Sequence, residues 1–149
     1  MIAAIRVRGP AKSKGDTKDT LEMLHLSKPN NCSLIPETET ADGMLQKGKD
    51  YITWGEVKPD VLEKMLAKWG RVNGGRLTDD YLKTKKTTMK KVTEELISGK
   101  TSLKALGIKQ PIRLHPPRQG YEGVKRPYSM KGALGYRGDA INELLTRMI

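Results

Sequence analysis

The fold is decided first by the stretch IAAIRVRGP at residues 2–10. Within this stretch Ile5 and Val7 alternate with Arg6 and Arg8, which is the period-two pattern of a strand with one buried and one solvated face. The glycine and proline that follow interrupt the pattern, because both residue types favour turns over a continuing strand. We therefore predict a half-buried N-terminal strand followed by a loop.

The next segments predict a regular alternation of helix and strand. A helix capped by Asp16 or Thr17 extends to about residue 27, and its apolar residues keep the spacing of a helix that covers a sheet. Such alternation is typical of an α/β sandwich, in which helices lie on one face of a small sheet. The elements predicted after this helix are a strand at 32–35, a short helix at 40–48 that Gly43 breaks, and a β-prone run at 51–54.

Residues 59–149 predict an extension with further helices. Pro59 is well placed at the first position of a helix and Gly70 just after its end, and the apolar residues between them keep helical spacing. The other elements predicted here are a turn at 73–75, short helices capped by Thr78 and by Thr87 or Thr88, a strand at 111–115, and a closing helix that Asp139 caps.

The charge of the chain indicates a polyanionic partner. Its 149 residues include 28 Lys and Arg against 17 Asp and Glu, a formal net charge of +11. Nucleic acid, an anionic membrane and an acidic protein all attract such a surface. We discount the membrane, because no apolar run approaches the roughly 20 residues that span a bilayer. The protein is expected to be cytoplasmic.

The residues that could support catalysis or metal binding are few. Cys32 is the only cysteine, and it opens an apolar run where a buried packing role is the usual outcome. With His25 and His115 as the only histidines, no conventional zinc cluster can be assembled. The glycine-rich run at 132–138 lacks the spacing of a nucleotide-binding loop. We therefore expect no enzyme, no metal, no cofactor and no small-molecule substrate.

Residues 118–138, which we call the Gly/Tyr segment, have no apolar period and predict a long basic loop instead of an ordinary element. The segment combines five glycines, five basic residues and three tyrosines with a single acid. Lys and Arg suit phosphates, Tyr can stack on unpaired bases, and Gly allows close backbone approach, so the composition favours folded RNA over a DNA groove. The closing helix that follows the segment is expected to anchor the C-terminus and so hold both ends of the loop, which predicts a presented loop and not a frayed tail.

A second basic run lies at residues 83–91, where five lysines occur without an acid. Runs of like charge on surface helices are common without any partner. From the sequence, the partner of these lysines can be RNA, a neighbouring protein or solvent.

Four motifs give the chain a specific resemblance that spans essentially its whole length: DYITWGE at 50–56, RLHPPR at 113–118, GALGYRG at 132–138 and INELLTRM at 141–148. Together they resemble the archaeal L-thirty family of large-subunit ribosomal proteins, whose eukaryotic relatives are called L-seven. The resemblance implies a structural constituent of the large ribosomal subunit that assembles on its ribosomal RNA beside neighbouring ribosomal proteins, without catalytic activity or cofactor. Bacterial members resemble only the first 58 or so residues, a β-α-β-α-β unit.

We accordingly predict an α+β fold with two parts: a ferredoxin-like RNA-binding core at 1–58 with a small, mostly antiparallel sheet, and a second part at 59–149. The second part comprises the helical insertion, the returning strand, the Gly/Tyr segment and the C-terminal helix. The predicted function is to bind and stabilise folded large-subunit ribosomal RNA; the alternative is a basic RNA chaperone or a subunit of an RNA-modification complex. The predicted RNA-binding residues are Arg6, Arg8, Lys12, Lys14, Lys18, Lys28, Asn30, Asn31, His115, Arg118, Tyr121, Lys125, Arg126, Tyr128, Lys131, Tyr136 and Arg137.

Overall fold

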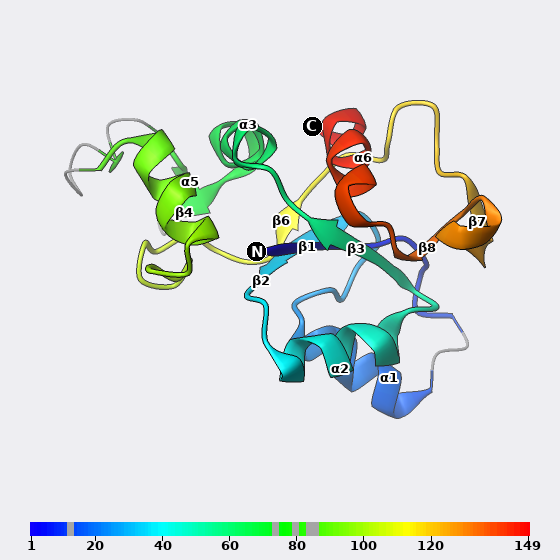
Figure 1. The fold of residues 1–149 in the computed structure, drawn as a ribbon. Helices are drawn as coiled ribbons and strands as arrows, with labels where there is room; N and C mark the ends of the chain where they lie inside the picture. Colours follow the sequence, from blue (N-terminus) through cyan, green and yellow to red (C-terminus); the bar gives the residue numbers. More distant parts are fainter. Residues whose placement is uncertain (12–13, 73–74, 79–80, 83–86) are drawn as a thin grey trace.

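The first 58 residues form three neighbouring strands and two helices, in the order that the sequence predicts. A computed structural model describes residues 1–11, 14–72, 75–78, 81–82 and 87–149 (Figure 1). The elements of this first part are β1 (Ile2–Arg6), α1 (Gly15–Met23), β2 (Asn31–Ile35), α2 (Glu39–Gly48) and β3 (Ile52–Glu56). The elements of the later part are α3 (Pro59–Trp69), β4 (Arg71–Val72), β5 (Gly75–Arg76), α5 (Met89–Ile97), β6 (Ile112–Arg113), β7 (Gly123–Pro127), β8 (Gly132–Tyr136) and α6 (Ile141–Met148).

The main sheet has six strands in the order β6-β2-β1-β3-β8-β7. Its centre is antiparallel, because β1 pairs in that sense with both β2 and β3, and β6 continues the same pattern on β2. On the other side β8 pairs with β3 in parallel, and β7 pairs with β8 in parallel. The predicted α+β fold, ferredoxin-like with a small antiparallel sheet, is confirmed.

Both faces of the sheet are covered. All five residues of β1 are buried. Successive side chains of a strand point to opposite faces, and accordingly Ile2 and Ala4 join a core with α1 and α2, whereas Ala3 and Ile5 join a core with α3, α5 and α6. Figure 1 shows α1 and α2 below the sheet and α3 and α6 above it. The prediction that the first strand is half-buried is wrong, because α1 and α2 cover the face of Arg6 that we assigned to solvent, and α3, α5 and α6 cover the opposite face.

We predicted that the Gly/Tyr segment is a loop without regular structure, and this prediction is wrong. The segment contains the strands β7 and β8 and a 3₁₀ turn at Tyr128–Met130 between them. No apolar period marks β7, because all five of its residues are exposed. In β8 the period is short, since only Ala133 and Leu134 are buried apolar side chains between glycines. Gly132 is required by close packing: a Cβ at this position would overlap the carbonyl oxygen of Arg126.

Helix ends agree with the sequence in α3 and α5 and differ elsewhere. Pro59 begins α3, and Thr88 precedes α5, as predicted. Helix α1 already begins at Gly15, one or two residues before the predicted caps, which places Asp16 in the first turn where the helix dipole favours an acid. Helix α2 continues through Gly43, since one interior glycine costs only about 1 kcal/mol. Helix α6 follows a 3₁₀ turn at Gly138–Ala140 and has no side-chain cap from Asp139.

The predicted turn at 73–75 and the lysine run at 83–86 fall, in part or wholly, outside the described residues. The same is true of part of the helix predicted to begin at Thr78. Of the helices in the described part of the chain, none combines the length and apolar character needed to cross a membrane.

Candidate nucleic-acid interface

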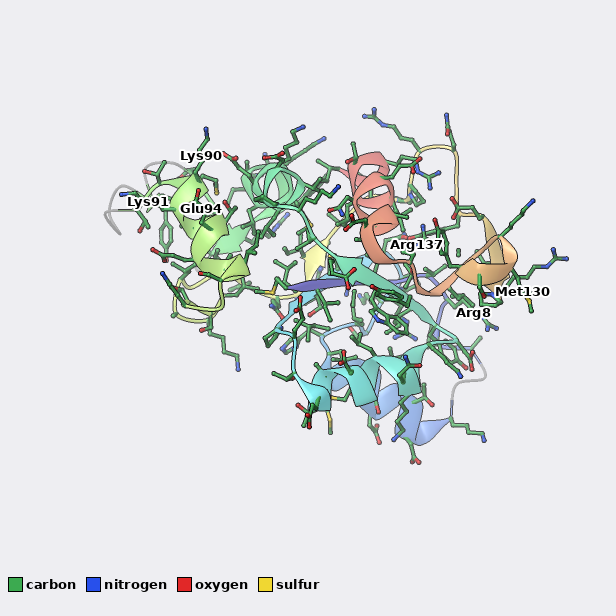
Figure 2. All side chains as sticks on the ribbon, viewed as in Figure 1. Arg8, Lys90, Lys91, Glu94, Met130 and Arg137 are labelled. Carbon is green, nitrogen blue, oxygen red and sulfur yellow. The ribbon has the colours of Figure 1, made fainter. Side chains whose placement is uncertain are left out.

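The Gly/Tyr segment is attached to the end of β1 by a small apolar cluster. Val7, which directly follows β1, packs with Ala133 and Leu134 of β8, and the ring of Tyr121 packs against the same group. Arg8 and Met130 therefore lie at the same end of the molecule, as Figure 2 shows. This end combines the loop after β1 with the exposed strand β7 and the 3₁₀ turn.

Arg137 lies beneath this surface and not on it. Its side chain is buried, with Nε donating to Thr53 Oγ1 at 2.9 Å and Nη2 donating to Ala133 O at 3.0 Å. The guanidinium also lies 3.6 Å from Glu122 Oε2 and 4.7 Å from the centre of the Tyr128 ring. Burial lowers the pKa of Arg137, and the carboxylate of Glu122 opposes that change. Arg137 thus joins β3, β8 and the turn at residue 128 into one unit.

Glu122 connects two arginines on the underside of the same segment. It accepts a hydrogen bond from Arg147 Nη2 at 2.9 Å and pairs with Arg137. Partial burial acts to raise the pKa of Glu122, but a backbone hydrogen bond, the hydrogen bond from Arg147 and the two positive charges together hold it below its ordinary value. The only acid of the segment is therefore used to hold the segment in place.

Arg6, the first of the predicted RNA-binding residues, is also internal. It is 1% exposed, and its Nη1 donates to the carbonyl oxygens of Leu26 at 2.6 Å and Ser27 at 2.9 Å. Its Nε donates to Arg8 O at 2.9 Å. Burial lowers the pKa of Arg6. The guanidinium therefore fixes the chain that leaves α1 against the end of β1, and it is not available to a phosphate at the surface.

Asn30 and Tyr121 connect the core to the Gly/Tyr segment. Asn30 has a left-handed backbone with φ of 62°, a conformation that Asn tolerates better than most residues. Its Oδ1 accepts a hydrogen bond from the Tyr121 hydroxyl at 2.7 Å. The same hydroxyl contacts Met148 Sδ at 3.8 Å, and burial raises the pKa of Tyr121. Asn31 is buried in β2. These three predicted residues thus lie in the framework that supports the surface.

The remaining predicted residues lie mainly at the surface. Arg8 is half-buried, with Nη1 donating to Asp50 O at 3.2 Å and its guanidinium 5.3 Å from the centre of the Tyr51 ring. Lys12 lies outside the described residues. The exposed members are Lys14, Lys18, Lys28, His115, Arg118, Lys125, Arg126, Tyr128, Lys131 and Tyr136.

The structure brings only some of these exposed residues together. Lys125, Arg126 and Lys131 follow one another along β7 and the turn before β8. Lys14 and Lys18 belong to the beginning of α1, on the side of the sheet opposite α6 (Figure 1). His115 instead contacts Trp69 at the end of α3, with ring centres 4.7 Å apart. The predicted set is therefore a principal surface on β7 with separate outlying groups.

Two apolar residues on this surface escaped the sequence analysis. Met130 is 68% exposed and Val124 is 43% exposed, and both lie next to basic residues of the Gly/Tyr segment. Tyr136 is also exposed, but its hydroxyl donates to Glu56 Oε1 at 2.7 Å, and this hydrogen bond raises the pKa of Tyr136. One feature of the sequence could have indicated them. Apolar residues around position 124 do not recur with the period of a strand or helix that has a buried face, so Val124 is not part of such a face.

A hollow beside β2, at the other side of the sheet from β7, is lined mainly by apolar residues. It encloses about 700 Å³ and is lined largely by apolar side chains, among them Met1, Met23, Leu34 and Ile108. Of the described residues around it, none is an acid, so a pair of carboxylates for acid–base catalysis is not found there. Nor does the described part of the chain gather three metal-ligating side chains at one point.

Comparison with known proteins gives a consistent result. The family model described as Ribosomal protein L30p/L7e matches residues 2–52. The large ribosomal subunit protein uL30 of Nanoarchaeum equitans is 44% identical over 153 aligned residues, which cover 100% of this chain and 99% of the relative. The proteins of the same name from Methanosphaera stadtmanae, 44% identical with 100% of both chains covered, and Methanopyrus kandleri, 46% identical with 96% of this chain and 100% of the relative covered, match similarly.

Proposed function

The chain belongs to the L30p/L7e family of ribosomal proteins, and from this premise we propose that it binds and stabilises folded large-subunit ribosomal RNA through the surface of its Gly/Tyr segment. As a member of the family it is a structural constituent of the large ribosomal subunit in the cytoplasm, and not an enzyme. The proposal concerns which part of the surface meets the RNA and by what chemistry.

The observation that carries the proposal is the exposure of β7. A strand whose five residues are all exposed contributes little to a core, so its composition is free to serve a partner. Lys125 and Arg126 on this strand can each reach a phosphate, and Arg can do so with two parallel hydrogen bonds. Tyr128 and Met130, which follow directly, offer apolar surface on which an unpaired base can stack.

The contacts beneath this strand support the proposal further. Arg137, Glu122 and Tyr121 hold the segment to β3, α6 and the core by hydrogen bonds between 2.7 and 3.0 Å. A surface that is ordered before binding loses less conformational entropy when the RNA docks. The segment therefore resembles a fixed platform more than a tail that folds on its partner.

Filter binding to a fragment of large-subunit ribosomal RNA tests the proposal. Arg126→Ala should weaken binding by about 1–3 kcal/mol, the range for losing a charge-assisted hydrogen bond. The matched comparison uses two double variants, one with Lys125→Gln and Arg126→Gln and the other with Lys90→Gln and Lys91→Gln. Each double variant removes two exposed positive charges. We expect the first pair to weaken binding several times more than the second.

The reverse order would place the interface on α5, where Figure 2 shows Lys90 and Lys91, and would overturn the assignment to the Gly/Tyr segment. The salt dependence gives a second readout. Each neutralised phosphate contributes roughly 0.7 to 0.9 to the slope of log affinity against log salt, the figures measured for single- and double-stranded DNA. A slope near zero would mean that the charge of +11 serves solubility and not recognition.

A further inference from the structure

A second hollow, which is basic, lies where α3, the chain after β6 and α6 meet, away from β7. It is lined by Lys68, His115, Pro116, Arg118, Arg147, Met148 and Ile149 and encloses about 500 Å³. Three of these residues carry a permanent positive charge, and of the described residues that line the hollow, none has a carboxylate side chain. Segments that are far apart in the sequence therefore bring their positive charges together around one concave surface.

The hollow has a defined internal structure. Lys68 Nζ donates to the main-chain oxygen of Ile149, and the backbone N–H of Arg118 donates to Arg147 O at 3.0 Å. The His115 ring meets the Trp69 ring edge-on, with an interplanar angle of 83°. These contacts set the positions of Lys68, His115 and the backbone of Arg118 independently of a ligand, while the guanidinium of Arg118 remains exposed.

Arg147 provides an observation that points to a ligand rich in acceptors. Its Nη2 donates to Glu122, but among the described residues its Nε is a buried donor without a hydrogen-bond partner. An arginine carries five N–H donors, so the guanidinium of Arg147 keeps donors beyond the one that Glu122 accepts. A phosphate group offers several oxygens, and it matches the planar fork of an arginine and the point charge of a lysine.

We propose that this hollow binds a phosphate group of the RNA backbone, held by Lys68, Arg118 and Arg147 with His115 beside it. The inference rests on the proposed RNA-binding function and extends it to α3 and α6. Arg118 begins the Gly/Tyr segment, and Glu122 pairs with both Arg147 of the hollow and Arg137 beneath the principal surface. An RNA strand on β7 can therefore continue along residues 118–122 into the hollow.

The test is RNA binding by two double variants with equal loss of charge. Lys68→Gln with Arg118→Gln removes two exposed cations from the hollow, and Lys64→Gln with Arg113→Gln removes two exposed cations from α3 and β6 that do not line it. Thermal unfolding confirms that both variants fold. The hollow pair should weaken binding by about tenfold or more and lower the salt slope by roughly 0.7 to 0.9, the contribution of one phosphate. The control pair should change affinity by less than about threefold, or about 0.65 kcal/mol, and leave the slope unchanged.

Equal effects of the two pairs would show general attraction and overturn the inference, as would wild-type binding by the hollow pair. In that case variants of β7 that still weaken binding would leave the proposed function standing. If the wild-type chain does not bind the RNA fragment, both proposals fail together. A titration of the wild-type protein with inorganic phosphate separates the sources: perturbation of the His115 ring signals by free phosphate, with RNA binding unaffected in the hollow pair, would assign the hollow to a soluble phosphate and refute the RNA contact.

Discussion

Replacement of Arg137 by Met should show whether this buried residue stabilises the fold beneath the RNA-binding surface, in contrast to the exposed residues of that surface. The change keeps much of the volume of the side chain and removes its hydrogen bonds to Thr53 Oγ1 and Ala133 O, its ion pair with Glu122 and its contact with the Tyr128 ring. Thr53 is fully buried, so in the variant its hydroxyl oxygen no longer accepts the hydrogen bond from Arg137, and water cannot easily reach it to replace that donor.

The expected cost follows from these contacts. Two hydrogen bonds from a charged donor contribute about 1.5–3 kcal/mol each, which gives a gross loss of about 3–6 kcal/mol. The variant no longer buries a guanidinium, and the relief of that desolvation offsets part of the loss. We therefore expect the free energy of unfolding to fall by about 3 kcal/mol, the lower end of the gross loss from the two hydrogen bonds.

Urea unfolding of Arg137→Met beside Arg126→Met measures this difference, since both changes replace one arginine of the same segment. Arg126 is exposed, so its replacement should change stability by less than about 0.5 kcal/mol while it still weakens RNA binding. Arg137→Met should lower both stability and affinity. A loss of stability below about 0.5 kcal/mol for Arg137→Met would refute the supporting role that we assign to this residue.

Three further predictions concern Cys32, Glu122 and the lysine run. Burial raises the pKa of Cys32 to about 12, so a thiol reagent at neutral pH should label it only after unfolding; rapid labelling of the folded protein would contradict its packing role. The folded pKa of Glu122 is lowered, so its contribution to stability is present above the ordinary Glu value of about 4.3 and is lost as pH falls through the folded pKa. Because Glu122 is substantially exposed, this contribution to stability should be only about 0.5 kcal/mol. Glu122→Gln should abolish it when urea midpoints are compared at neutral and acid pH. An unchanged acid dependence in the variant would show that the ion pairs of Glu122 do not stabilise the fold. Changes at Lys83, Lys85 and Lys86 should weaken RNA binding less than changes at Arg118, Lys125 or Arg126 on the same fragment at the same salt, and the opposite result would move the interface to the insertion.

Much of the fold could be predicted from the sequence because its signals are local. The alternation of strand and helix in the first 58 residues and the proline at the start of α3 depend on neighbouring residues alone. The burial of both faces of β1 is not local, since it depends on helices that lie at residues 59–69 and 141–148. Strand β7 also escaped detection, because an edge strand with five exposed residues has no apolar period to display.

The candidate site also contains residues whose state the sequence suggests and residues whose state depends on distant parts of the chain. Lys125 and Arg126 are exposed, which is the usual state of a charged side chain and the one that the sequence suggests. Arg6 and Arg137 are buried, because their acceptors come from Leu26 and Ser27 in one case and from Thr53 and Ala133 in the other. Thr53 lies 84 residues from Arg137 in the chain, so no local pattern distinguishes a supporting arginine from a binding one.

The measurement that tests the central claim most directly is the retention of the protein on purified large ribosomal subunits after a high-salt wash, followed by sedimentation. A structural constituent that binds ribosomal RNA through a preformed basic surface should remain with the particle as a single copy, and the pair Lys125→Gln and Arg126→Gln should lower that retention. Release of the wild-type protein into the supernatant would contradict the account and would indicate a transient factor, such as an RNA chaperone or a subunit of an RNA-modification complex.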